Sequence, residues 1–212
     1  MTFLDILTKF REEALSERDK GDKFEKLIVR WFLSDPIYAP QLSHVWQWSD
    51  FPGKEEFGGR DLGIDIVCRT NDGDYWAVQC KFYKDITITE QILSTFLGNS
   101  ERQFTDPIDN IANTRFSCRI WVSTYDVWTS NADELIRNIN PPFQKIDSYQ
   151  LGESNVDWDA LYTGTKIEKP KKLLRDHQKK ALKEGHTLEL PLLKRTLSVI
   201  KRADEFPRRE HP

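Results

Sequence analysis

Residues 64–81 read IDIVCRTNDGDYWAVQCK and decide the fold. Apolar and polar residues alternate in two runs, Ile64–Cys68 and Trp76–Cys80, and such alternation is typical of β-strands with one buried face. The segment Asn71–Gly73 separates the two runs and consists of residues that favour turns. The stretch therefore predicts a β-hairpin.

The register of this hairpin follows from its turn. Counting antiparallel pairs outward places Ile66 opposite Val78 and Asp65 opposite Gln79, with Lys81 diagonal to Asp65. A slip by one residue would break the pairing of Ile66 with Val78 and would bury Asp65. The apolar pairing thus predicts that Asp65, Gln79 and Lys81 share one polar face of the hairpin.

Two helices are predicted before the hairpin. Apolar residues recur at helical spacing within residues 3–14 and again within residues 24–32. Gly21 and Asp22 are expected to separate these helices, with Asp22 as the N-cap of the second one. Glu25 would then lie in the first turn, where the helix dipole favours an acidic side chain.

The remainder of the chain predicts further alternation of helices and strands. Thr87 or Thr89 is expected to cap a helix that contains Ile92–Leu97. Trp46 and Trp48 are expected to pack on one face of a strand rather than to stack on bases. The other expected elements are a strand over Phe116–Ser123, a helix over Ala132–Asn138, a strand over Ile146–Leu151 and a helical turn over Val156–Tyr162. This order predicts an α/β fold with a mixed β-sheet flanked by helices on both faces.

Length and composition exclude several classes of protein. A chain of 212 residues is long enough for one main domain, and its composition is that of a folded protein. No apolar run is long enough for a membrane span, and the N-terminal residues lack a secretory signal, so a cytoplasmic protein without a membrane partner is expected. The three cysteines have no metal-binding or disulfide spacing and are expected to be buried free thiols.

Charge is distributed unevenly along the chain. Residues 1–165 contain 17 Lys and Arg against 27 Asp and Glu, whereas residues 166–202 contain 12 against 4. The N-terminal part is therefore acidic, and a basic helical tail is expected over residues 166–212.

The predicted polar face has the chemistry of phosphodiester hydrolysis. This reaction needs an activated water and neutralisation of charge on the phosphorus oxygens, and a carboxylate-held Mg²⁺ supplies both. Asp65 is the expected anchoring ligand, with oxygen ligands from the Gln79 side chain and the Cys80 backbone carbonyl. Lys81 can orient the water or stabilise the developing charge.

The same residues carry a resemblance to a known family. The stretches GRDLGID (residues 59–65) and VQCK (residues 78–81) resemble the PD-(D/E)xK nuclease signature in its Mrr-like form, in which glutamine replaces the usual acid. The resemblance implies a restriction-endonuclease-like fold, metal binding by Asp65 and Gln79, and a catalytic Lys81. It also implies Mg²⁺ as cofactor, which Mn²⁺ can replace, and Glu25 as an additional acid of the site.

A narrower resemblance concerns residues 21–33, 46–65 and 75–83. They are similar to the N-terminal nuclease domain of Type ISP restriction-modification enzymes, which implies a nuclease domain over residues 1–165. Residues 173–182, which read LLRDHQKKAL, resemble the lead-in to a superfamily 2 helicase core, although no phosphate-binding loop follows. The resemblance implies DNA as a partner, together with helicase-like, methyltransferase and target-recognition domains of a larger polypeptide or complex.

Several assignments leave alternatives open. Arg60, Lys84 and Gln91 are candidates for contacts with DNA phosphates, but each could equally be a solvated surface residue. Asp61 could hold the metal in place of Asp65, although its glycine-rich surroundings favour a turn. Glu25 could be an ordinary exposed helical acid.

Three functions follow from these observations. The first is a sequence-nonspecific, Mg²⁺-dependent DNA endonuclease domain of a restriction-modification system. The second is a catalytically inactive nuclease fold that serves as a DNA-binding or protein-docking module through its basic tail. The third is an RNA nuclease that uses the same site.

Overall fold

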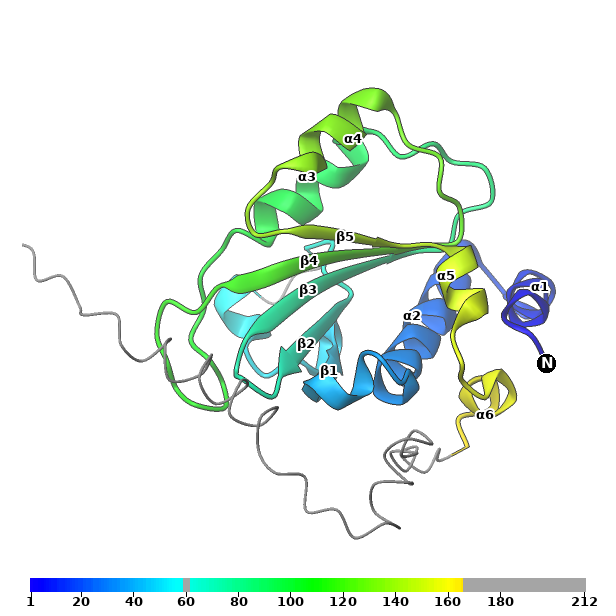
Figure 1. Ribbon diagram of the computed structural model, residues 1–212, viewed down its shortest axis with the longest axis horizontal. Coiled ribbons are helices and arrows are strands. Elements are labelled where there is room, and N and C mark those ends of the chain that lie inside the picture. The colour runs from blue at the N-terminus through cyan, green and yellow to red at the C-terminus, as the bar shows by residue number, and fades with distance from the viewer. Residues whose placement is uncertain (59–61, 166–212) are drawn as a thin grey trace, which may run out of the picture. The chain divides into compact units, whose positions relative to one another are not determined.

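A five-stranded sheet organises the chain (Figure 1). The computed structural model describes residues 1–58 and 62–165. The strands lie in the order β1-β2-β3-β4-β5; β1, β2 and β3 pair antiparallel, whereas β4 and β5 continue the sheet in parallel. Their bounds are β1 Leu42–Gln47, β2 Ile66–Thr70, β3 Tyr75–Lys81, β4 Phe116–Ser123 and β5 Phe143–Ile146. The sheet is mixed, as predicted.

The predicted hairpin is formed by β2 and β3 in the predicted register. Ile66 pairs with Val78, and the Thr70 N–H donates to the Asp74 carbonyl at 2.8 Å beside the turn. Gly73 occupies the turn with φ of +92°, a backbone conformation that glycine adopts without the steric cost of a Cβ atom. The turn residues and the apolar pairing thus specify one register.

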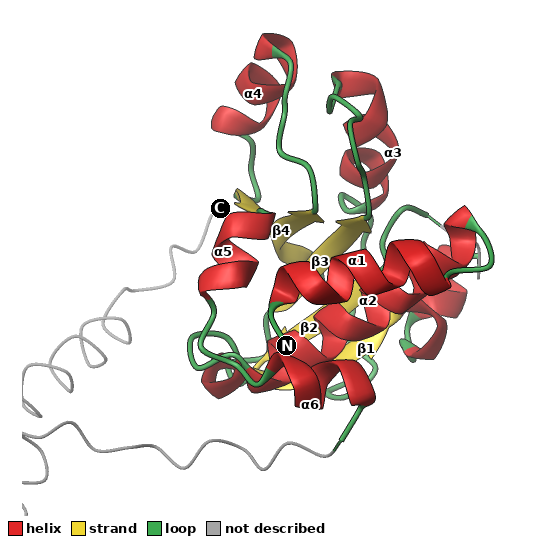
Figure 2. Cartoon of the chain, turned by 90° about the vertical axis from the view of Figure 1, so that its right-hand side faces the viewer, coloured by secondary structure: helices red, strands yellow, loops and turns green. Residues whose placement is uncertain are grey.

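Helices cover both faces of the sheet (Figure 2). Side chains of α1 (Phe3–Glu13), α2 (Glu17–Ser34), α5 (Ser148–Glu153) and α6 (Trp158–Thr163) pack on one face. Side chains of α3 (Glu90–Asn99) and α4 (Ser130–Arg137) pack on the other. The predicted fold class is confirmed: it is α/β, with a mixed sheet between two helical layers.

The burial of both faces corrects the expectation of a polar hairpin face. Val67 and Ala77 belong to the core beneath α3, on the face that was expected to be polar. Ile64 belongs to this same core, whereas Ile66 packs on the opposite face against α2. The alternation expected from residue 64 therefore begins only at Ile66, because β2 starts there.

The boundary between the first two helices also differs from the prediction. α2 begins at Glu17 and runs for 18 residues, with Ser16 as its N-cap. Gly21 and Asp22 thus lie inside this helix, and the prediction of Asp22 as N-cap is wrong. Glu25 lies in the third turn instead of the first. Ser16 caps the helix six residues before the predicted cap, because its hydroxyl accepts a hydrogen bond from the Asp19 N–H at 3.1 Å.

The C-terminal half confirms most predicted elements. Thr89 caps α3, β4 covers the predicted range, and α4 and α6 lie where helices were expected. The strand predicted over Ile146–Leu151 is wrong, because β5 ends at Ile146 and α5 follows. Asp147 and Gln150 form a capping box, in which each side chain accepts from the other residue's backbone N–H, and this box starts a helix.

Strand β1 was indicated only by the expectation that Trp46 and Trp48 pack on one face of a strand; it contains Trp46 and ends before Trp48. It pairs with β2 and places Trp46 against the core beneath α3. Trp48, in the short 3-10 helix that follows, packs against the same core, so the prediction that both tryptophans pack is confirmed. The 3-10 helices are η1 Ala39–Gln41, η2 Trp48–Asp50 and η3 Lys54–Phe57.

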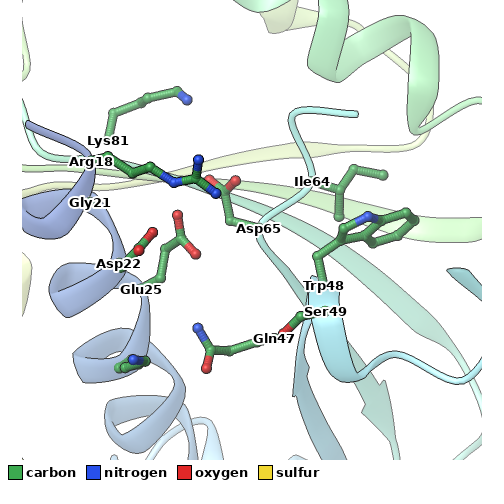
Figure 3. Close-up of a pocket in the computed structure, with 11 residues that line it drawn as sticks. Arg18, Gly21, Asp22, Glu25, Gln47, Trp48, Ser49, Ile64, Asp65 and Lys81 are labelled. Carbon is green, nitrogen blue, oxygen red and sulfur yellow. The ribbon is translucent and has the colours of Figure 1, made fainter. Parts of the chain in front are cut away.

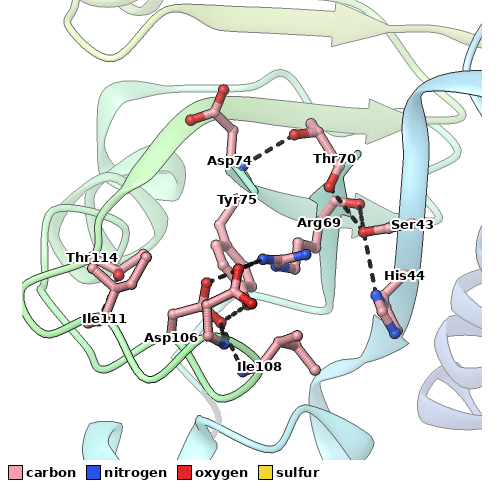
Figure 4. Close-up of polar contacts among 11 residues, drawn as sticks. Ser43, His44, Arg69, Thr70, Asp74, Tyr75, Asp106, Ile108, Ile111 and Thr114 are labelled. Carbon is pink, nitrogen blue, oxygen red and sulfur yellow. Dashed lines mark hydrogen bonds and ion pairs between the residues drawn. The ribbon is translucent and has the colours of Figure 1, made fainter. Parts of the chain in front are cut away.

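A buried ionic network fixes the long segment between α3 and β4 to the sheet (Figure 4). Arg69 of β2 pairs with Asp106 at 3.4 Å and also with Asp109, while the Tyr75 hydroxyl donates to Asp106 at 2.6 Å. Burial alone would raise the pKa of Asp106, but hydrogen bonds from Tyr75 and two backbone N–H groups, with the Arg69 charge, hold it below its ordinary value.

Cys68 and Cys80 are buried and Cys118 is half-buried, and all three are free, which confirms the prediction of free thiols. Among the described residues, no helix combines the length and apolarity that a membrane span requires.

Candidate active site

A pocket of about 740 Å³ lies where β2 and β3 separate (Figure 3). Its wall on one side is α2, its opposite wall is the end of β1, and Asp65 and Lys81 come from the hairpin. The lining residues are Arg18, Gly21, Asp22, Glu25, Lys26, Gln47, Trp48, Ser49, Ile64, Asp65 and Lys81. Three of the residues predicted for the site, Glu25, Asp65 and Lys81, therefore line one pocket.

Asp65 is held in place by hydrogen bonds to β3 and to η2. Its N–H donates to the Val78 carbonyl at 2.9 Å, and its carbonyl accepts from the Trp48 N–H at 2.8 Å. Its carboxylate accepts from the Cys80 N–H at 2.6 Å. The Asp65 carboxylate thus replaces the backbone carbonyl of a neighbouring strand as the acceptor for the Cys80 N–H. These three bonds orient the carboxylate before any ligand arrives.

The backbone carbonyl of Cys80 points to the same side of β3 as the Asp65 carboxylate. The neighbouring Lys81 carbonyl accepts from the Thr124 N–H at 3.1 Å, on the side of β4. Backbone groups of successive residues in a strand point to opposite sides, so the Cys80 carbonyl points to the side where Asp65 lies. A carboxylate and a backbone carbonyl are hard oxygen donors of the kind that Mg²⁺ binds.

Glu25 reaches the pocket because α2 packs its apolar side on the sheet. Phe24, Leu27 and Ile28 are buried against the strands, and Glu25 stands half-buried at the edge of this contact. Figure 3 shows the carboxylates of Glu25 and Asp65 pointing into the same space. The burial of these apolar residues thus fixes the rotation of α2 so that Glu25 faces Asp65.

The pKa of the Cys80 thiol depends on the charges of Asp65, Glu25 and Lys81. Burial raises the pKa of its thiol well above the ordinary value, and the negative charges of Asp65 and Glu25 raise it further. The positive charge of Lys81 acts in the opposite direction. All three charged side chains therefore lie close to Cys80.

Gln79 is placed differently from the other predicted residues. Its side chain is 4% exposed and is not part of the pocket lining. It lies beneath Gly63, where a Cβ atom would come within 3.1 Å of Nε2. Among the described residues, its Oε1 has no hydrogen-bond partner. The face shared by Gln79 and Ala77 is covered by α3, which the sequence pattern did not indicate.

The predicted DNA contacts fall in three different places. Lys84 lines a second pocket beside the first. Gln91 is exposed on α3 and lines neither of these pockets. Arg60 and the alternative metal ligand Asp61 lie outside the described residues. So does the predicted basic tail, residues 166–212.

The structure adds residues that sequence reasoning missed, above all Arg18. Its guanidinium extends toward Asp65 (Figure 3) and forms no hydrogen bond or ion pair with the part of the chain that the structure describes. Arg18 precedes Glu25 by seven residues, and this spacing puts both on one face of a helix. The signal was hidden because a helix boundary was expected at Gly21.

Within residues 1–58 and 62–165, no group of three or more His, Cys, Asp or Glu side chains could hold a metal ion. A divalent ion in this pocket would therefore depend on few side chains together with backbone oxygen and water, as Mg²⁺ sites commonly do.

Comparison with known proteins identifies the family. A family model described as a restriction endonuclease matches residues 33–168. The chain belongs to this restriction endonuclease family. The matched residues include Asp65, Gln79 and Lys81, whereas the pocket residues of α2, from Arg18 to Lys26, precede the match.

The restriction endonuclease fold also has a solved counterpart. The structure is similar to that of the ATP-dependent Type ISP restriction-modification enzyme LlaBIII bound to DNA, with a TM-score of 0.59 and 24% sequence identity. The similarity covers 92% of this chain but only 11% of that enzyme. No curated protein matches the sequence.

Proposed function

We propose that this restriction endonuclease domain hydrolyses DNA phosphodiester bonds with the help of Mg²⁺, without sequence specificity of its own. The observation that carries the proposal is the convergence of Glu25, Asp65 and Lys81 on one pocket. These residues come from α2, from the segment before β2 and from β3. Two carboxylates and an ammonium group in one pocket suit a reaction that proceeds through a highly charged phosphate.

The donor atoms present fit a hard divalent cation. The Asp65 carboxylate and the Cys80 carbonyl lie on the same edge of β3 and would hold Mg²⁺ or Mn²⁺. We retain Gln79 as a proposed ligand, because a buried acceptor without a donor costs about 1–3 kcal/mol and a bound cation removes that cost. When bound, the ion supplies Lewis-acid activation of the phosphate and of a water molecule.

The protein side chains have separate roles in this proposal. Hydrolysis forms a bond between a water oxygen and phosphorus and breaks the bond between phosphorus and the leaving oxygen. The Lys81 ammonium donates hydrogen bonds to phosphate oxygens, where negative charge grows in the transition state. Glu25 accepts a hydrogen bond from the attacking water and orients it toward phosphorus.

Target choice and DNA delivery would come from other domains. Residues 1–165 are acidic overall, so they gain little affinity from the release of counterions around DNA. We infer that the domain works with helicase-like, methyltransferase and target-recognition parts, as in a Type ISP restriction-modification enzyme. The expected cytoplasmic location stays a prediction.

One observation favours the alternative of an inactive DNA-binding or protein-docking module. Gln79 replaces the acid of the signature, and its side chain does not line the pocket. Such a module would keep an intact fold and its binding surface but would cleave no nucleic acid.

Cleavage assays on the Lys81→Ala variant separate these functions. The wild-type chain, with Mg²⁺ or Mn²⁺, is expected to cleave duplex DNA, and Lys81→Ala is expected to lose about 10²–10³-fold of that rate. Lys9→Ala on α1 is the matched control and should cleave like the wild type. Single-stranded DNA and RNA are tested in parallel, since preferential cleavage of RNA would indicate an RNA nuclease. Cleavage that persists unchanged in Lys81→Ala would refute the proposed site, and binding without any cleavage would favour the inactive module.

A further inference from the structure

A second pocket adjoins the candidate active site. It has a volume of about 430 Å³ and shares Gly21, Glu25 and Lys81 with the first pocket. Its remaining lining comes from α1, from the start of α2, from Cys80 of β3 and from the segment after β3. The two pockets thus meet along α2 at Gly21 and Glu25, one helical turn apart.

Positive charge is concentrated along these two pockets. Six of the 17 Lys and Arg in residues 1–165 line them, accompanied by five acids. Elsewhere in residues 1–165, 22 acids stand against 11 basic residues. The six are Arg11, Arg18, Lys20, Lys26, Lys81 and Lys84. The lining of the two pockets thus has 6 basic residues against 5 acids, close to neutral, whereas the rest of residues 1–165 has 11 against 22, so the pockets repel DNA phosphates least.

Within residues 1–58 and 62–165, neither packing nor backbone conformation explains the glycine at position 21. It lies inside α2, where glycine costs roughly 0.5–1 kcal/mol relative to alanine. A Cβ atom at this position would meet no atom of the described residues within 4 Å, and no positive φ angle requires glycine. Packing and backbone conformation would both accept a side chain here. Gly98 of α3 and Gly152 of α5 have the same open space, but of these three glycines only Gly21 lines the two pockets, where a ligand can closely approach the helix backbone.

We propose that the backbone of the bound nucleic-acid strand crosses α2 at Gly21. This inference rests on the proposed function, because it places the scissile phosphate in the first pocket, beside Asp65 and Lys81. The neighbouring phosphates of the same strand lie in the second pocket, where Arg11, Lys20 and Lys84 line the path. A side chain at position 21 would project into the passage between the two pockets.

The second pocket is built to hold cations at its rim. Arg11 packs its guanidinium over the Phe82 ring, with 5.3 Å between the guanidinium carbon and the ring centroid. Lys20 pairs with the exposed Glu17 at 2.5 Å. An exposed pair of this kind contributes little to stability, so a phosphate can compete with Glu17 for the Lys20 ammonium at small cost.

The test compares two helical glycines, each of which has open space where a Cβ atom would lie. Gly21→Leu places a side chain between the pockets, and Gly98→Leu places the same side chain on α3, away from both. Both substitutions replace a helical glycine by a better helix former, so both variants should melt at or above the wild-type temperature. Binding of a labelled duplex and of the corresponding single strand is measured with the full chain at low ionic strength without divalent metal, so that no cleavage occurs.

Gly21→Leu is expected to bind DNA roughly tenfold more weakly than the wild type, which corresponds to the loss of one good phosphate contact. Gly98→Leu should bind like the wild type, and Gly21→Ala should lie between them. Equal binding by the two leucine variants would overturn the inference, as would a wild-type chain that binds neither DNA form. A loss of binding confined to Gly21→Leu would support the strand path even if the wild-type chain proved unable to cleave, an outcome that would refute only the proposed nuclease function.

Discussion

Asp65→Asn separates the structural role of this residue from its proposed role as a metal ligand. Asparagine keeps the shape of the side chain and one oxygen that can accept from the Cys80 N–H. A hydrogen bond to a charged acceptor contributes about 1.5–3 kcal/mol, and a neutral one contributes about 0.5–1.5 kcal/mol. Without metal, the variant should therefore lose about 1 kcal/mol of unfolding free energy. For a domain of this size that loss lowers the melting temperature by about 2–4 °C.

Added Mg²⁺ should raise the melting temperature of the wild type but not that of Asp65→Asn, and the lost hydrogen-bond strength alone would not produce this difference. At a free Mg²⁺ concentration tenfold above the dissociation constant, binding adds about 1.4 kcal/mol to the stability of the wild type. Its melting temperature should then rise by about 3–6 °C, whereas that of Asp65→Asn should stay constant. The measurement is thermal melting over a MgCl₂ series, with ionic strength held constant by NaCl.

Asp22→Asn is the matched control for this experiment. Asp22 lines the same pocket from α2, is exposed, and was not predicted as a ligand. It should keep the full rise in melting temperature with Mg²⁺. Asp65 is not a metal ligand of the proposed kind if Asp65→Asn retains the rise, if Asp22→Asn loses it, or if the wild type shows none at saturating Mg²⁺ or Mn²⁺.

Two further predictions concern the supports of the site. Gly63→Ala should lower the unfolding free energy by roughly 1–2 kcal/mol in chemical denaturation, because φ is +70° and the new Cβ would lie 3.1 Å from the Gln79 amide. Gly58→Ala, with φ of +83° and no atom within 4 Å of its Cβ, is the control and should lose less. Tyr75→Phe removes a donor to Asp106 and should cost about 1.5–3 kcal/mol near neutral pH. Because the pKa of Asp106 is lowered in the folded state, its contribution is present above the ordinary value of 3.8 and is lost as pH falls below it. Denaturation curves from pH 7 to pH 3 should therefore converge for wild type and Tyr75→Phe, and parallel curves would contradict the assignment.

The hairpin could be predicted because its determinants are local. The turn residues 71–73 and the pairing of Ile66 with Val78 admit one register, and the structure has that register. Helices α3 and α4 were likewise predictable from apolar spacing and from a threonine cap at residue 89. Where local sequence and packing require the same geometry, the sequence alone is sufficient.

The errors occurred where two local signals compete. Gly21 and Asp22 resemble a helix boundary, but the Ser16 cap and the burial of Phe24 and Leu27 keep the helix continuous. In the same way, one strand was expected over Ile146–Leu151, and both of these apolar end residues are indeed buried. The capping box of Asp147 turns the chain into a helix between them.

The site could be predicted in part, for a related reason. Asp65 and Lys81 were proposed as site residues from their spacing, and Glu25 from the resemblance, and all three line the pocket. Gln79 was expected beside them because strand alternation was taken to leave one face polar. Helix α3, distant in sequence, covers that face and buries Gln79. Arg18 was missed because its alignment with Glu25 exists only if α2 is continuous.

The distribution of charge in residues 1–165 bears on two proposals, the path of the DNA strand and the need for other domains that deliver DNA. Six cations along the two pockets can neutralise about six phosphates at most, and each contributes a salt dependence of about −0.9 in the logarithmic binding slope. The 22 acids against 11 basic residues in the rest of residues 1–165 oppose the approach of DNA, so they favour this path for the strand while they weaken its binding. A covalent link to a DNA-bound motor would raise the effective DNA concentration into the millimolar range and offset that weakness. If the domain cleaves DNA and has partner domains as proposed, its acidity would limit cleavage to DNA that those partners deliver.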